Sequence, residues 1–447
     1  MKLNMREYLF GSVFRRGASL LTALTIVSYA LGLVRDMVFA RVLGASRLLD
    51  VYNAAFIIPD VLLNIFIAGA LAAAFVPVFT QLLAKEQREE ARELATTMLV
   101  GAPISMLFIG VLAYIGMPHF AGVVAPGFSG DDLALLIHLS RIMLISPILF
   151  ALSNTLGGIL VSLERFAGYG LSPVLYNLGI IAGAFLVAPL GPIGLVIGTI
   201  AGAALHLLVR IISTLRSGFT IHGPINFSGT YFRNVLRLMI PRMAGQPVEQ
   251  LTFFLFTNLA STLSAGSIAI LSFARNFESV PVSVFGISFA TAVFASLSRY
   301  AALDDDASFM RTLKEAARPL LFVTTLSTAF YILAGPLVIK MLLGGGHFGS
   351  HQIAATASLL AWFSLGIPAE AFIHLFVRAF YALKDTWTPI FVSVPGLGLI
   401  WLLARLWMPT MGLNGLGLAY ALASTIEAVL LVALLRRRLQ QRSGFSI

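Results

Sequence analysis

The stretch LGLVRDMVFARVLG, residues 31–44, closes an apolar run that begins near residue 18, and it carries Arg35, Asp36 and Arg41 inside that run. The run is longer than the ~20 residues with which an α-helix crosses a bilayer. Because a charge inside a membrane helix is costly, it usually marks a functional site or an internal ion pair. We therefore expect this helix to face a polar cavity between helices.

The composition of the whole chain is that of a membrane protein. Of its 447 residues, 58% are hydrophobic and 11% are charged, and the mean hydropathy is +0.91. Soluble domains do not reach such values, and the alternating pattern of barrel strands is absent, so we predict an all-α polytopic membrane protein. The chain has no cysteine, which excludes disulfides, thiol catalysis and Cys-ligated metals.

Segments long enough to span the bilayer follow one another along the chain, and we predict about twelve. Their approximate bounds are 18–43, 51–83, 94–117, 133–163, 168–188, 190–215, 235–263, 267–298, 315–343, 352–382, 387–408 and 412–435. Lys and Arg gather in alternate gaps between these segments, with 21 in one set of gaps and 3 in the other. Under the positive-inside rule, this asymmetry predicts cytoplasmic termini, and it accounts for the net charge of +10 without a nucleic-acid partner.

The sequence also contains traces of an internal duplication. Gly44 and Pro59 recur as Gly266 and Pro281, both 222 residues later. The segment GPIGLVIGT (191–199) is similar to GLNGLGLAY (412–420). A constant offset predicts two parallel six-helix lobes around a midplane cavity, an architecture typical of transporters that work by alternating access. The predicted parts are an interfacial N-terminal segment (1–17), an N-lobe (18–216), a cytoplasmic connector (217–234), a C-lobe (235–439) and a cytoplasmic tail (440–447).

Charged residues within the predicted spans are the candidate site residues. The candidate substrate contacts are Arg35, Asp50, Arg275, Glu278, His374 and Arg378; the candidate structural or gating residues are Asp36, Asp60 and Arg242; the candidate ion-coupling carboxylates are Glu249 and Glu427. Most charged positions fall on the first two helices of each half, which predicts one central cavity.

Two interpretations stay open for the first charge pair. Arg35 either contacts a substrate or helps to hold helices together. Asp36 is expected to hold its helix against another helix. Since adjacent helical positions diverge by about 100°, we expect each side chain to pair with another group and not with its neighbour.

Alternatives also stay open on the later helices. Arg275 and Glu278, spaced i, i+3, either pair internally or line the cavity. Glu370, His374 and Arg378 recur every four residues and predict a polar stripe on one helix face. A stripe of small residues at Gly194, Gly198 and Gly202 predicts close helix packing.

Enzyme signatures are missing from the sequence. It contains no GxSxG, no Walker loop and no HExxH. His374 stands without a cluster of further ligands, so we expect no metal site, no cofactor and no catalytic residue. Without a nucleotide loop, transport would draw on an ion gradient, the membrane potential or the substrate gradient.

Five motifs together carry a resemblance to a known family. They are GLVRDMVFARVLGAS and AFVPVF within 32–79, APGF (125–128), SVPVSVFGISFATAVFASLS (279–298) and FYALKDTWTP (380–389). These motifs resemble those of the MurJ/MviN lipid II flippases, a family of the multidrug/oligosaccharidyl-lipid/polysaccharide exporter superfamily.

The resemblance implies a V-shaped, two-lobed flippase of the bacterial cytoplasmic membrane. Such a protein would move a polyprenyl-diphosphate-linked cell-wall precursor, lipid II or a related lipid-linked glycan, to the outer leaflet. Arg35 matches a cavity cation of the family and Asp50 matches its acid; a guanidinium fork suits phosphate oxygens. The implied partners of this monomer are the lipid substrate, membrane lipids, a coupling cation (H⁺ or Na⁺) and cell-wall synthesis proteins.

The chain departs from the family pattern at several cavity positions. Tyr29, Asn276 and His374 stand where basic residues are usual. Two other functions therefore stay open: an ion-coupled exporter of small amphipathic solutes, and a membrane scaffold of the same fold that does not transport.

Overall fold

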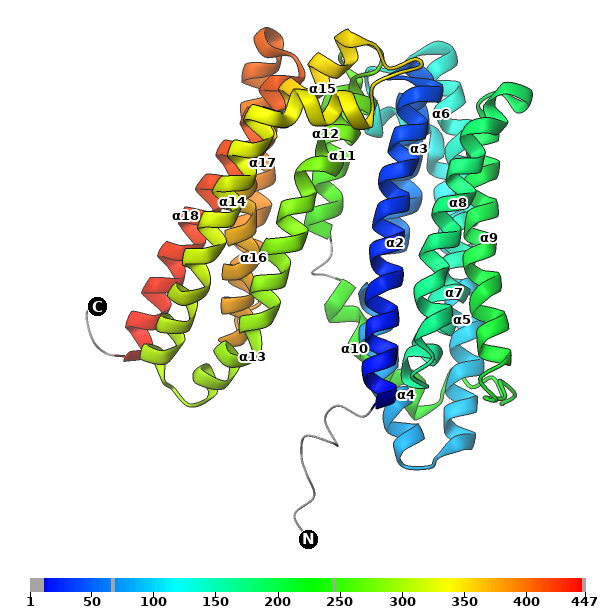
Figure 1. Cartoon of the computed structure of the whole chain (residues 1–447). Coiled ribbons are helices and arrows are strands. Elements are labelled where there is room, and N and C mark those ends of the chain that lie inside the picture. Colours follow the sequence, from blue (N-terminus) through cyan, green and yellow to red (C-terminus); the bar gives the residue numbers. More distant parts are fainter. Residues whose placement is uncertain (1–11, 66–68, 244–246, 444–447) are drawn as a thin grey trace. The chain divides into compact units, whose positions relative to one another are not determined.

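The described part of the chain, residues 12–65, 69–243 and 247–443 of a computed structural model, is built from helices (Figure 1). Within these residues there is no β-strand, and the one isolated bridge joins Gly345 and Phe348. The prediction of an all-α protein is confirmed. The chain divides into two compact units: the first holds Met1–Leu43 and Arg47–Gln250, and the second holds Gly44–Ser46 and Leu251–Ile447.

The first unit contains nine of the helices labelled in Figure 1. They are α2 (Ser12–Leu43), α3 (Arg47–Leu63), α4 (Gly69–Ala84), α5 (Arg88–Val124), α6 (Gly130–Met143), α7 (Ile145–Ser162), α8 (Phe166–Leu190), α9 (Ile193–Leu215) and α10 (Thr230–Met243). Helix α2 packs along α8, and α8 packs along α9. Helix α10 packs on α4 and α5.

The second unit contains most of α11, whose first residues up to Gln250 belong to the first unit, and all the helices after it. They are α11 (Pro247–Ser261), α12 (Ser267–Pro281), the π-helical segment η2 (Val282–Ile287), α13 (Ser288–Ala302), α14 (Asp306–Leu342), α15 (Ser350–Ser364), α16 (Ile367–Ala382), α17 (Trp387–Met411) and α18 (Leu413–Ser443). Helices α17 and α18 pack together, and α16 packs against α13, α14 and α18. The lobe and connector boundaries expected from the sequence stay a prediction.

Membrane-spanning helices account for most of the described chain. Nine of its helices are long and apolar enough to cross a bilayer, and α15 with α16, which meet at a bend of 44°, make a tenth. Two more expected spans, 51–83 and 235–263, include residues 66–68 and 244–246, which lie outside the described part. A multi-pass helical membrane protein is confirmed, whereas the count of twelve stays a prediction.

The backbone repeats itself along the chain. Left-handed residues lie in the turns between helices at four pairs of positions that are between 218 and 222 residues apart. The pairs are Gly44 with Gly266, Glu86 with Asp304, Glu164 with Lys384, and Gly191 with Gly412. Helices α8 and α17 both have 25 residues, and α5 and α14 both have 37. Since left-handed backbone is uncommon outside glycine, this recurrence confirms an internal duplication.

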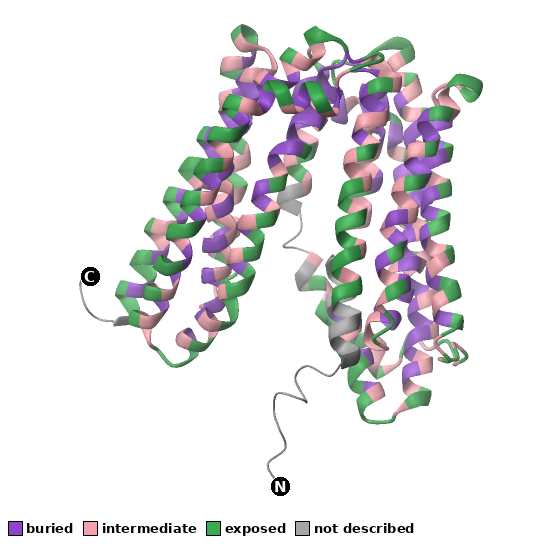
Figure 2. Cartoon of the chain, in the orientation of Figure 1, coloured by how far each residue is buried: buried purple, intermediate pink, exposed green. Residues whose placement is uncertain are grey.

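Packing inside each unit is apolar, and so is much of the outside. Figure 2 shows buried residues where helices meet and exposed residues along their outer faces. Phe75, Phe79 and Leu94 lie in one buried cluster of the first unit, and Phe309 and Phe380 lie in one of the second. Large exposed side chains such as Leu, Ile and Phe recur on the outer faces. Such a surface is stable only against lipid.

The expected small-residue packing is present between α8 and α9. A Cβ atom added to Gly198 would overlap backbone atoms of Gly183, and one added to Gly194 would overlap the backbone at Leu186. Small residues therefore let these two helix backbones approach closely, as the glycine stripe predicted.

Candidate functional site

The first candidate cluster is centred on Arg35 of α2. Its Nε and Nη2 atoms both donate to Asp36 Oδ1, at 3.1 and 2.9 Å. The expectation that these neighbours do not pair is wrong: the 100° rule describes where Cβ atoms point, whereas a guanidinium at the end of a long flexible chain can turn back to the next residue. The Asp36 side chain is 7% exposed and that of Arg35 is 28% exposed, so the cation remains partly open.

Two tyrosines and a second acid complete this cluster. Arg35 interacts electrostatically with Tyr52 of α3, Tyr176 of α8 and Asp60 of α3. Tyr52 and Thr199 share a hydrogen bond of 2.7 Å, which ties α3 to α9. Asp60 and Tyr176 both line a small cavity between α3, α7 and α8. Groups from α3 and α8 thus surround the partly exposed guanidinium of α2, an arrangement suited to binding an anion.

Asp50, the acid matched to the family, lies elsewhere in the first unit. It is 1% exposed and lies 3.8 Å from Arg47 Nη1, one turn earlier on α3. Arg47 also approaches Asp132 of α6 at 3.4 Å and covers the Phe128 ring at 4.9 Å. Substrate contact by Asp50 stays a prediction, and in this structure the side chain joins α3 to α6 through Arg47.

The second cluster surrounds Arg275 in the second unit. Its Nη1 atom lies 2.5 Å from Glu278 Oε2 on α12 and 3.4 Å from Glu370 Oε2 on α16. Arg275 is 8% exposed and Glu278 is 0% exposed. The internal i, i+3 pair, one of two open interpretations, is therefore formed, and the polar stripe of α16 contributes a further carboxylate.

Aromatic rings enclose the same guanidinium. The Arg275 Cζ atom lies 4.7 Å from the ring centre of Tyr420, 5.6 Å from Phe363 and 5.7 Å from Phe256. A cation between ring faces is stabilised by their quadrupoles. The sequence offered a signal for the charges but none for the three rings, because they come from α11, α15 and α18, which lie far apart along the chain.

The other candidate residues are more dispersed. His374 and Arg378 of α16 are half-buried. Glu427 of α18 accepts a hydrogen bond of 2.5 Å from Ser393 on α17, so this carboxylate joins two helices. The side chains of Arg242 and Glu249 lie outside the described residues. The roles assigned to these five residues stay predictions.

Sequence reasoning missed a buried cation on α9. Arg210 is not among the candidate site residues, but it is 4% exposed and donates to Ser172 Oγ at 3.0 Å, to the Ser153 carbonyl at 2.8 Å and to Asn154 Oδ1 at 3.0 Å. Its position inside the apolar segment 190–215 was the available signal. These neutral acceptors connect α7, α8 and α9.

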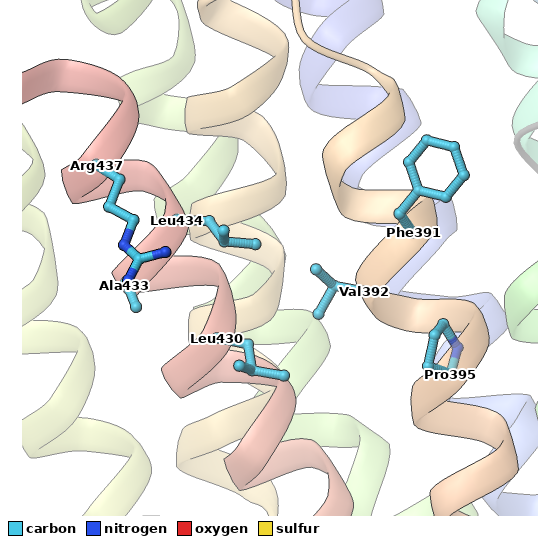
Figure 3. A pocket seen from close by; sticks show the side chains of 7 residues that line it. All are labelled: Phe391, Val392, Pro395, Leu430, Ala433, Leu434 and Arg437. Carbon is cyan, nitrogen blue, oxygen red and sulfur yellow. The ribbon is translucent and has the colours of Figure 1, made fainter. Parts of the chain in front are cut away.

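An apolar groove runs between α17 and α18 (Figure 3). It has a volume of about 340 Å³ and is lined by Phe391, Val392, Pro395, Leu430, Ala433, Leu434 and Arg437. One end carries the Arg437 guanidinium and the walls are hydrocarbon. Such a groove suits a hydrocarbon chain.

Repeated helical units with charge clusters inside apolar helices define a polytopic membrane protein of the transporter class. A family model described as lipid II flippase MurJ matches residues 39–446. The chain therefore belongs to the MurJ lipid II flippase family.

Individual relatives agree with this assignment. The lipid II flippase MurJ of Burkholderia cenocepacia is 26% identical over 426 residues, which are 93% of this chain and 82% of the relative. The probable lipid II flippase MurJ of Haemophilus influenzae is 28% identical over 444 residues, with 91% and 83% covered.

Solved structures show the same fold. A structure described as lipid II flippase MurJ in an inward closed conformation is 27% identical, with a TM-score of 0.79 and coverage of 93% of this chain and 87% of that one. An inward-facing multidrug transporter of the MATE family reaches a TM-score of 0.74 at 16% identity, with coverage of 96% and 100%, which shows the fold alone.

Proposed function

We propose that this protein moves a polyprenyl-diphosphate-linked cell-wall precursor, lipid II or a related lipid-linked glycan, across the bacterial cytoplasmic membrane. The observation that carries the proposal is the Arg35 cluster within a chain of this family. Arg35 is charged, 28% exposed and held by Asp36, so it can present a guanidinium fork to a diphosphate. The protein acts as a flippase by alternating access and does not convert its substrate.

The proposed energy source is an ion gradient or the membrane potential. Glu249 and Glu427 are the proposed coupling carboxylates for H⁺ or Na⁺, and the carboxylate of Glu427 lies deep in α18. Both termini face the cytoplasm in this proposal, because Lys and Arg gather in the gaps on that side. Membrane lipids fill outer grooves such as the one between α17 and α18, and cell-wall synthesis proteins are the proposed protein partners.

A binding titration tests the substrate class. Purified protein in lipid nanodiscs should bind a polyprenyl diphosphate lipid more tightly than the corresponding neutral polyprenol. Arg35→Ala should remove this preference. Arg405→Gln, which changes an exposed arginine of α17, is the matched control and should keep it.

The titration also separates the two other functions. Binding of a cationic amphipathic solute in place of the diphosphate lipid would favour the exporter. Equal, weak binding of both lipids by the wild type and Arg35→Ala would favour a scaffold without transport and would contradict the proposed function.

A further inference from the structure

The Arg275 cluster contains more negative than positive charge. One guanidinium nitrogen, Arg275 Nη1, faces both Glu278 and Glu370. Arginine does not lose its proton in proteins, so it contributes one positive charge against two carboxyl groups. In the first unit, by contrast, both hydrogen bonds from Arg35 run to one carboxylate, that of Asp36.

Burial makes this imbalance expensive. Glu278 is 0% exposed, and the side chain of Glu370 is 17% exposed. A carboxylate without a full counter-charge in such a place is costly, and the usual outcome is that the group takes up a proton. Two carboxyl groups at one site behave in this way because both cannot ionise at close range.

The contacts within the cluster also indicate that one carboxyl group carries a proton. Among the described residues, the buried Glu278 Oε1 atom meets no ordinary hydrogen-bond donor. The side chains of Glu278 and Glu370 are nevertheless within hydrogen-bonding reach of each other. Two carboxyl groups can form that bond only when one of them carries a proton, since an ionised carboxylate only accepts.

We propose that Glu278 and Glu370 form a proton-binding site in the second unit, with Arg275 balancing one carboxylate and a single shared proton balancing the other. The proposal goes beyond flipping, because it concerns a proton held by the purified protein whether or not lipid moves. Releasing the proton leaves an uncompensated negative charge between α12 and α16. The protonated form therefore holds these helices together, and the deprotonated form favours their separation or the entry of water.

Other titratable groups face the pair from each neighbouring helix. His374 of α16 and Glu427 of α18 act on Glu370, and Tyr331 of α14 acts on Glu278. Tyr420 of α18 acts on both acids and hydrogen-bonds Glu370. His374 is the one neighbour among the described residues that could supply the missing positive charge, so it must be tested separately.

Infrared difference spectroscopy tests the proposal directly. At neutral pH, the spectrum of the wild type minus that of Glu278→Gln should contain one carboxylic-acid C=O band, and so should wild type minus Glu370→Gln. Either glutamine leaves one carboxylate for Arg275, so each change removes the same proton. The subtraction cancels the signals of all other carboxyl groups.

The control is Asp36→Asn, because Asp36 alone accepts both hydrogen bonds from the Arg35 guanidinium. The wild type minus Asp36→Asn spectrum should contain a carboxylate band and no carboxylic-acid band. Each glutamine variant keeps one carboxylate opposite Arg275, so both should fold. Because neither has the shared proton to release, their melting temperatures should respond less to alkaline pH than that of the wild type.

Three results would overturn the proposal. One is a carboxylate band in place of the acid band in both glutamine difference spectra. Another is the absence of an acid band in the Glu278→Gln and Glu370→Gln difference spectra, together with a melting temperature of His374→Gln that no longer responds to pH as that of the wild type does. This result would place the balancing positive charge on the His374 imidazole. The third is that Na⁺ at fixed pH raises the melting temperature of the wild type but not that of Glu278→Gln, while the difference spectra contain no acid band. This result would mean that the site holds a metal cation in place of a proton.

Discussion

At the scale of single residues, Arg35 combines charge, partial exposure and a fixed orientation. Both hydrogen bonds from its guanidinium run to Asp36, which is itself buried. The acid therefore restrains the rotamers of the arginine and lowers the entropy cost of binding an anion. The pairing was not predictable from helical angles, because the reach of a guanidinium is longer than the separation of adjacent Cβ atoms.

Changing Arg35 should reduce substrate affinity more than stability. We expect Arg35→Ala to weaken binding of a diphosphate lipid by about 1.5–3 kcal/mol, the range for a hydrogen bond to a charged group. Arg35→Lys should keep part of that affinity, because an ammonium keeps the charge but not the planar fork. Lipid titrations together with thermal melts measure both effects; an unchanged affinity with a lowered melting temperature would make Arg35 a scaffold residue.

Asp36→Asn should lower both stability and affinity. The amide leaves a partly buried guanidinium without its counter-charge, and it no longer fixes the direction of Arg35. The same melts and titrations apply. An affinity equal to that of the wild type would show that Asp36 does not orient the arginine.

At the scale of elements, the family motif FYALKDTWTP ends α16 and begins α17. Asp385, its acid, accepts hydrogen bonds from the Trp387 and Thr388 backbone amides and from the Thr388 hydroxyl, at 3.2, 3.0 and 2.7 Å. Partial burial works to raise the pKa of Asp385, but these donors outweigh it and hold the pKa below its usual range. The motif residue therefore has a structural role as a helix cap.

Asp385→Ala should destabilise the protein by about 1 kcal/mol at neutral pH, the typical cost of removing a helix cap. A lowered pKa means that the carboxylate stabilises the fold above the pKa of the unfolded chain, and that this contribution is lost as the pH falls through the folded-state value. The difference in melting temperature between the two proteins should therefore shrink in acid. A difference that grows in acid would contradict this assignment.

The contact between α8 and α9 gives a second test at this scale. Gly198→Ala places a methyl group against the Gly183 backbone and should cost about 1–3 kcal/mol, as overpacking does. Gly110→Ala in α5 is the control, because an added Cβ atom there meets nothing within 4 Å. The control should be neutral or stabilising, since alanine favours helix. Equal melting temperatures for the two variants would show that the close packing does not matter.

At the scale of the whole molecule, the repeat and the membrane class were predictable from the sequence. Apolar length predicted the spans, and the offset from Gly44 to Gly266 predicted the duplicated path. The interior of each cluster was not predictable. The rings around Arg275 come from helices that are distant in sequence, and single-sequence periodicity does not show which faces of those helices meet.

The predicted orientation can be measured because the natural chain has no cysteine. Single cysteines at Thr410, in the last turn of α17, and at Ser350, at the start of α15, should react with a membrane-impermeant thiol reagent in intact cells. A cysteine at Gln441, near the end of α18, should react only after the membrane is permeabilised. The reverse pattern would overturn the predicted cytoplasmic termini.

The central claim is that this chain flips a polyprenyl-diphosphate-linked lipid through the Arg35 cluster. Protein reconstituted into vesicles with a labelled lipid of this kind in one leaflet tests it most directly, with the label read by an impermeant quencher or enzyme. The wild type and Arg405→Gln should transfer the lipid to the other leaflet, whereas Arg35→Ala should be at least about tenfold slower, in line with ~1.5 kcal/mol lost. Transfer by Arg35→Ala at the wild-type rate, or no transfer by folded wild type with either an ion gradient or a membrane potential imposed, would contradict the account.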